Sequence, residues 1–182
     1  MFLGIDASLR RTGICFSNGA KHETFSLPTP EDLRGPARLD WLVNNFRDTC
    51  GQRLDTVTQA AIEGYAMGAK GRVFDIAEWG GVLRLILYRA KVPLIVIAPS
   101  TAKKYLSAGN MEKNQVLLEV YKQYGVSCAT DDEADALVMA DMARQHYLRP
   151  AGLPKRQLEA LQKAEILIPN NKTKAARISR DR

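Results

Sequence analysis

MFLGIDASLR, residues 1–10, carries the clearest structural signal in this chain. The apolar run over residues 2–5 is short and contains a glycine, which favours a buried strand over a helix. This strand ends in Asp6, and a polar turn follows. A carboxylate at the last residue of a buried strand is held by rigid backbone at the sheet edge, which suits a metal ligand. In the alternative interpretation, Asp6 simply ends the strand and accepts hydrogen bonds from turn amides.

The same pattern recurs at AAIEGY, residues 60–65, where a second apolar strand ends in Glu63. Two adjacent parallel strands that both end in carboxylates would bring them together at the C-terminal edge of the sheet. Open α/β sheets bind their ligands at that edge. The loop that follows contains three glycines and carries Lys70 and Arg72.

A third acidic group lies in TDDEADALVMA, residues 130–140, which predicts the start of a helix. Acids at a helix start suit the helix dipole, so they need no functional explanation. Asp135 is different, because it lies one turn in among apolar residues, where an unpaired carboxylate is costly to bury. Asp132 shares its helix face. Together with Asp6 and Glu63 they would form a strongly negative cluster, which hard divalent cations neutralise best.

The remaining pattern alternates strands with helices. An Asn18-Gly19 turn joins two strands into a hairpin, so the first three strands are expected to be antiparallel. Further strands are predicted at 12–17, 21–27, 57–62 and 93–99, and helices at 37–50, 73–90, 100–106, 109–124, from 130 onward and at 154–168. The fold class is therefore α/β, with a five-stranded mixed sheet flanked by helices.

The predicted helix over residues 73–90 has two unusual features. Paired glycines at 80–81 cost helix stability, so we expect this helix to lie very close to the sheet. Its apolar residues also occupy more than one face: Ile76, Trp79, Val82, Leu83, Ile86 and Leu87. They either pack under the next helix or form a patch for a second copy of the chain.

Charge is unevenly distributed along the 182 residues. Residues 1–148 contain 17 basic and 17 acidic side chains, whereas residues 149–182 contain nine basic and three acidic ones. We expect a domain over 1–148 and a basic extension over 149–182, with a helix to 168 followed by a flexible arm. This arm either engages a polyanionic partner or serves as a solubilising extension.

Other features exclude several classes of protein. The chain has no signal-peptide pattern and no long apolar run, so we expect an intracellular protein with no membrane partner. Its three cysteines are widely spaced, which makes disulfides and a zinc site improbable. No Ser-His-Asp arrangement is evident around its two histidines.

Five short motifs together resemble a known family. They are FLGID (2–6), AIEG (61–64), PSTAK (99–103), EKNQV (112–116) and DEADAL (132–137). In this combination the chain resembles the RuvC-type Holliday-junction resolvases of the ribonuclease H-like superfamily, and the phage-encoded branch more than the bacterial one. The resemblance covers about residues 1–145. It departs from the family pattern at Ala7-Ser8, where Pro-Gly is usual, and the chain after Arg149 has no counterpart in it.

The resemblance implies a set of site residues. The ligands of two Mg²⁺ or Mn²⁺ ions would be Asp6, Glu63, Asp132 and Asp135. Lys113 would lie beside the scissile phosphate, and Lys103 would help to hold DNA. Tyr65 lies near the position where the family places an aromatic ring against an unstacked base. Lys70 and Arg72 of the glycine-containing loop are further candidate DNA contacts.

The implied function is resolution of branched DNA by paired nicks, in recombination and repair, within a bacterial or phage-infected cytoplasm. Two ions about 4 Å apart can activate water and neutralise the leaving group. Asp6 would bridge both ions, Glu63 and Asp135 would each serve one, Asp132 would assist or orient water, and Lys113 would add positive charge. A near-symmetric junction cut twice requires two related sites, so we expect a homodimer.

Three alternatives remain open. One is a junction-binding module with this fold that does not cleave. A second is a relative that acts on flaps or on RNA, because loops and dimer geometry set the substrate. The third, an ATPase of the actin and sugar-kinase type, would need two such domains, and the chain holds one.

Overall fold

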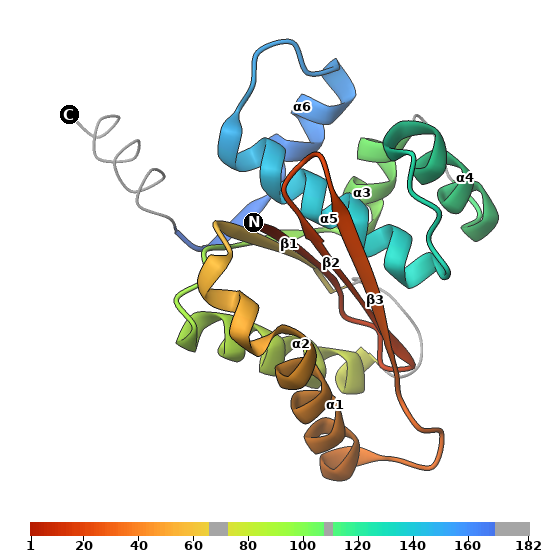
Figure 1. Cartoon of the computed structure of the whole chain (residues 1–182), viewed down its shortest axis with the longest axis vertical. Helices are drawn as coiled ribbons and strands as arrows, with labels where there is room; N and C mark the ends of the chain where they lie inside the picture. The colour runs from red at the N-terminus through yellow and green to blue at the C-terminus, as the bar shows by residue number, and fades with distance from the viewer. Residues whose placement is uncertain (66–72, 108–110, 170–182) are drawn as a thin grey trace.

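The sheet is the centre of the fold. The computed structural model describes residues 1–65, 73–107 and 111–169 (Figure 1). The strands are β1 (Phe2–Asp6), β2 (Arg11–Ser17), β3 (His22–Pro28), β4 (Gln59–Glu63), β5 (Leu94–Ile97) and β6 (Glu165–Ile168). Their order across the sheet is β3-β2-β1-β4-β5-β6. The first three strands are antiparallel as expected, and β4 and β5 run parallel to β1.

Helices cover both faces of this sheet. They are α1 (Gly35–Cys50), the short 3-10 helix η1 (Gly51–Thr56), α2 (Val73–Arg89), α3 (Pro99–Leu106), α4 (Lys113–Tyr124), α5 (Asp131–Leu148) and α6 (Lys155–Gln162). Figure 1 shows α1 and α2 on one side of the sheet and α3 to α6 on the other. Each side has its own hydrophobic core.

Alternation along β1 decides which face carries Asp6. Leu3 and Ile5 belong to the core beneath α1 and α2, whereas Phe2 belongs to the core around α5. Because successive side chains of a strand point to opposite faces, Asp6 lies on the same face as Phe2 and Gly4. The acid at the end of β1 therefore faces α5.

Two strand glycines allow α5 to touch the sheet. A Cβ atom on Gly4 would lie 1.9 Å from the carbonyl oxygen of Ala136, and one on Gly13 would lie 1.9 Å from that of Asp132. Both contacts are with helix backbone, so a side chain cannot be accommodated without moving the helix. The first two turns of α5 therefore lie directly on β1 and β2.

The expectation that the paired glycines bring α2 close to the sheet is wrong. A Cβ on Gly80 would meet the ring of Tyr65 at 3.2 Å, and one on Gly81 would meet nothing within 4 Å. The closest helix-to-sheet approach thus belongs to α5. It is permitted by glycines in the strands and not by glycines in the helix.

The C-terminal part of the described chain also differs from the expected helix over 154–168. The helix α6 ends at Gln162, and Glu165–Ile168 forms β6, which pairs antiparallel with β5. The sheet therefore has six strands and not five. Exposed and half-buried residues alternate along EILI, which is the period of a strand, and the pairing covers the otherwise open edge of β5. The predicted flexible arm, residues 170–182, lies outside the described residues.

Two smaller observations concern the cysteines and the helix lengths. Cys15 and Cys50 are buried, Cys128 is half-buried, and all three thiols are free. Within the described ranges, no helix is both long enough and apolar enough to cross a membrane.

Candidate active site

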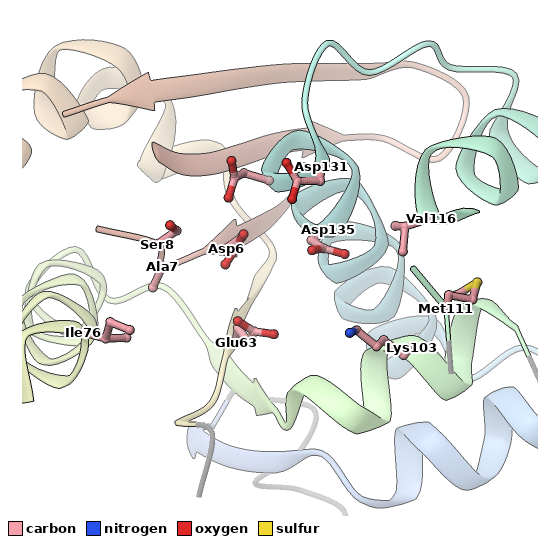
Figure 2. Close-up of a pocket in the computed structure, with 11 residues that line it drawn as sticks. Asp6, Ala7, Ser8, Glu63, Ile76, Lys103, Met111, Val116, Asp131 and Asp135 are labelled. Carbon is pink, nitrogen blue, oxygen red and sulfur yellow. The ribbon is translucent and has the colours of Figure 1, made fainter. Parts of the chain in front are cut away.

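The four acids singled out in the sequence line one pocket of about 290 Å³. Figure 2 shows Asp6, Glu63 and Asp135 around it, together with Asp131. The amine of Lys103 extends into the same space from α3. The other lining residues are Ala7, Ser8, Ile76, Met111, Val116 and Asp132. The pocket is therefore predominantly acidic with one lysine.

Strand register and helix packing explain why these acids meet. In the parallel pair of β1 and β4, Ile5 lies opposite Ile62, so the next residues, Asp6 and Glu63, end the two strands at the same level. The close contact of α5 with Gly13 then brings the start of that helix to Asp6, which is the register partner of Gly13. Two strand ends and a helix start thus meet at one edge of the sheet.

Not every acid at the start of α5 takes part. The carboxylate of Glu133 accepts hydrogen bonds from the Thr24 hydroxyl and the Ala129 amide, both at 3.1 Å. The Glu133 amide in turn donates to the Thr130 hydroxyl, the N-cap of the helix, at 3.2 Å. Glu133 is thus a structural residue that joins α5 to β3.

Burial, reinforced by repulsion between neighbouring acids, dominates the electrostatics of the pocket. Burial, and then the charges of Glu63, Asp135 and Asp132, hold the pKa of Asp6 well above its usual range. Burial and the charge of Asp135 raise the pKa of Glu63 to about 7, although hydrogen bonding to Asp6 and the charge of Lys103 act in the opposite direction. Because the pKa values of both Asp6 and Glu63 are raised, the cluster retains protons when no cation is bound.

The donor set fits hard divalent cations. Carboxylate oxygens are the ligands that Mg²⁺ and Mn²⁺ prefer, and neither histidine nor cysteine lines the pocket. In residues 1–65, 73–107 and 111–169, no three acidic, histidine or cysteine side chains are already arranged as a finished metal site. The acids surround the pocket instead of converging on one point. Bound cations would replace the retained protons, with Asp6, Glu63, Asp132 and Asp135 as the residues that would hold them.

The predicted basic site residues differ in where the structure places them. Lys103 lines the acidic pocket. Lys113 is the first residue of α4, and although its side chain lies outside the described part, Met111 and Val116 on either side of it line the pocket. The expected DNA contacts Lys70 and Arg72 lie outside the described residues.

Tyr65 lies against α2 and does not line the acidic pocket. Its hydroxyl donates to the carbonyl oxygen of Ala77 at 3.3 Å. The guanidinium of Arg84 lies 4.2 Å from the ring centroid, a cation–π contact. Tyr65 nevertheless stays 38% exposed and lines a separate pocket that also includes Lys163 of the C-terminal segment.

Sequence reasoning missed Asp131 and Ser8. Asp131 lies one turn before Asp135 on the same helix, and that spacing was a usable signal. Ser8 belongs to the turn that departs from Pro-Gly, and its carbonyl oxygen accepts a 2.9 Å hydrogen bond from the Thr12 hydroxyl. The turn is therefore closed by side-chain hydrogen bonding, and Ser8 lines the pocket.

Comparisons with known proteins agree with this geometry. No family model matches the chain. The crossover junction endodeoxyribonuclease RuvC of Nocardia farcinica is 29% identical over 147 residues, which cover 76% of this chain and 77% of that protein. A structure of Thermus thermophilus RuvC in complex with a Holliday junction substrate superposes with a TM-score of 0.66 at 18% identity, over 91% of this chain and 98% of that one. A second Thermus thermophilus RuvC structure gives 0.63 at the same identity and coverage. By its sequence this chain is similar to RuvC, and it has the ribonuclease H-like fold of the RuvC structures.

Proposed function

We propose that this protein is a metal-dependent endonuclease that resolves four-way DNA junctions by paired nicks. The observation that carries the proposal is the gathering of Asp6, Glu63, Asp132 and Asp135 in one pocket beside Lys103. The similarity to a crossover junction endodeoxyribonuclease supports the same substrate class. A relative of the same fold is known in complex with a Holliday junction.

Asp6 has the central role among the ligands. Its pKa is raised by the charges of Glu63 of β4 and of Asp132 and Asp135 of α5, so it would hold the cations from a position between the strand side and the helix side of the pocket. Glu63 would complete the site on the strand side, and Asp132 and Asp135 on the helix side. When bound, two Mg²⁺ or Mn²⁺ ions supply an activated water and neutralise the charge of the leaving oxygen.

Lys103 would bind the phosphate that enters the pocket. Its ammonium group is the one cationic side chain that lines this space among the described residues, and it already opposes the raised pKa of Glu63. A scissile phosphodiester brings negative charge into an acidic pocket, so it needs cations on its other side. Lys113, at the start of α4, is the second candidate for this role.

We further propose a homodimer formed through α2. Trp79, Leu83 and Leu87 of this helix are buried, whereas Leu85 and Tyr88 are 46% and 67% exposed. The exposed apolar side chains support a partner on this helix, and paired nicks in a two-fold junction require two related sites. A DNA substrate would place the protein in the cytoplasm of a bacterial or phage-infected cell.

A panel of substrates tests the proposal. Purified protein is incubated with end-labelled four-way, three-way, flap and linear DNA, and with a structured RNA, in Mg²⁺ or in EDTA. We expect Mg²⁺-dependent paired nicks in the four-way junction and little cleavage of linear DNA. Binding without cleavage would identify a non-catalytic junction-binding module. Preferential cleavage of flaps or RNA would support metal-dependent cleavage but would mean that the four-way junction is not the substrate.

A further inference from the structure

A second groove adjoins the acidic pocket and is lined by arginines. Its volume is about 650 Å³, and its basic lining residues are Arg10, Arg11, Arg34 and Arg38. Ser8, Asp131 and Asp132 line both the groove and the acidic pocket, so the two spaces share a boundary. We call this space the arginine groove.

The walls of the arginine groove are tied together by backbone contacts. Arg10 comes from the turn between β1 and β2, and Arg11 is the first residue of β2. The carbonyl oxygen of Arg10 accepts a 2.9 Å hydrogen bond from the amide of Thr29. Arg34 lies in the loop that leads to α1, where its guanidinium donates to the carbonyl oxygens of Glu31 and, at 2.7 Å, Leu33. The Arg34 side chain thus holds the backbone of its own loop in place before any ligand arrives.

Four arginines line the groove against three acids (Glu31, Asp131 and Asp132), so its charge balance favours an anion. Arg10 and Arg11 are exposed, and neither forms a salt bridge within residues 1–65, 73–107 and 111–169. Arg38, by contrast, is 4% exposed and packed into the wall. The first turn of α1 has no acidic residue and no side-chain cap, so the positive end of a 16-residue helix adds to the arginine charges. Guanidinium groups bind phosphate oxygens in a bidentate way, which makes them suited to a phosphodiester chain.

We propose that the arginine groove binds phosphates of the cleaved DNA strand next to the scissile phosphate. A strand whose phosphate lies among Asp6, Glu63 and Asp135 passes Ser8 at the shared boundary and continues between the arginines. This inference rests on the proposed nuclease function and adds a second binding subsite to it. The groove holds the strand in line with the acids by binding phosphates on one side of the cut.

The main test compares two double variants with the wild type. Arg10→Gln/Arg11→Gln removes two exposed charges from the groove. Lys21→Gln/Arg47→Gln removes two exposed charges far from the groove, at the β2–β3 turn and in the last turn of α1, and serves as the control. Affinity for a labelled four-way junction is measured in EDTA over a range of salt concentrations. Thermal melting confirms that each variant is folded.

We expect the groove variant to flatten the plot of log affinity against log salt by roughly 2, because each lost phosphate contact removes about 0.9 from the slope. At 0.1 M salt this corresponds to binding that is weaker on the order of 60-fold. The control should keep the wild-type slope. Arg10→Lys/Arg11→Lys retains the charges and should restore most of the salt dependence, which separates lost charge from damaged fold.

Uncharged linkages in the DNA backbone show which phosphates the arginine groove contacts. Methylphosphonate linkages are placed one at a time on either side of the mapped cut. We expect the wild type to lose affinity for linkages on one side of the cut and the groove variant to lose much less at the same positions.

The outcomes separate the two proposals. Wild-type slope and affinity in the groove variant, with junction cleavage intact in the wild type, would overturn the arginine groove and leave the nuclease function standing. If the wild type binds the junction without cleaving it, and the groove variant shows a flattened slope, the nuclease function would be overturned and the arginine groove would stand as a DNA-binding site. A wild type that binds no junction would overturn both.

Discussion

The contact between Gly13 and α5 gives a sharp test of how the site is assembled. In Gly13→Ala, the new Cβ would lie 1.9 Å from the carbonyl oxygen of Asp132, whereas ordinary contact begins at 3.4 Å. The helix start must therefore move away from β2 by about 1.5 Å. Because Gly13 is the register partner of Asp6, this movement separates Asp132 and Asp135 from Asp6.

We expect the cleavage rate of Gly13→Ala to fall by about 10²-fold or more, since a misplacement near 1 Å at a reacting centre has that effect. Overpacking of this kind costs about 1–3 kcal/mol of unfolding free energy, or roughly 2–12 °C in Tm for a chain of this length. The assay is single-turnover cleavage of a labelled four-way junction in Mg²⁺, at a temperature where melting shows the variant to be folded. Junction binding in EDTA should remain.

Gly51→Ala is the matched control. It is the same substitution at the start of η1, where φ is -52° and the new Cβ meets nothing within 4 Å, so it should leave cleavage unchanged and add up to about 1 kcal/mol of stability. A Gly13→Ala protein that is folded and cleaves within about threefold of Gly51→Ala would refute the packing of α5 against β2 as the cause of site assembly.

Three further predictions concern pH, the C-terminus and assembly. Because the folded state raises the pKa of Glu63 from 4.5 to about 7, the folded protein binds this proton more tightly than the unfolded chain. As the pH rises from 4.5 to 7, metal-free protein should therefore lose up to about 3 kcal/mol of unfolding free energy, and saturating Mg²⁺ should abolish this loss. An unfolding free energy, measured in urea without metal, that does not change with pH would contradict this. Residues 170–182 contain five basic residues and one acidic residue. Deleting them should flatten the slope of log junction affinity against log salt by roughly 3 and leave the cleavage rate at saturating DNA unchanged. Lost cleavage with an unchanged slope would mean that this segment belongs to the fold or the site. Light scattering should give the mass of two chains for the wild type and of one chain for Tyr88→Glu, whereas a monomeric wild type with and without junction DNA would exclude the dimer.

Local signals explain most of what the sequence predicted. The runs before Asp6 and Glu63 are short, apolar and end in an acid, so a single stretch indicates both the strand and where it stops. Their parallel pairing follows from the intervening helix. For that reason, the sequence alone predicts that residues more than fifty positions apart share one pocket.

Tertiary contacts explain what the sequence did not predict. Leu158 and Leu161 lie at helical spacing, and nothing local shows that the helix stops before EILI, residues 165–168, because that strand is stabilised by the edge of β5 about seventy residues earlier. The close approach of α5 had a local signal in Gly4 and Gly13, since glycine inside a strand often marks contact with another backbone. The arginine groove had none, because its four arginines come from two separate loops, the start of a strand and a helix.

The most direct measurement is cleavage of a labelled four-way junction by the wild type and by Asp6→Asn, side by side in Mg²⁺ and in EDTA. Asparagine keeps the shape of Asp6 and removes the charge that would be shared between the ions. We expect the wild type to cleave in Mg²⁺ only, and Asp6→Asn to cleave orders of magnitude more slowly while it binds the junction at least as tightly in EDTA. Cleavage by Asp6→Asn within about tenfold of the wild type would contradict a metal-dependent active site built on this carboxylate.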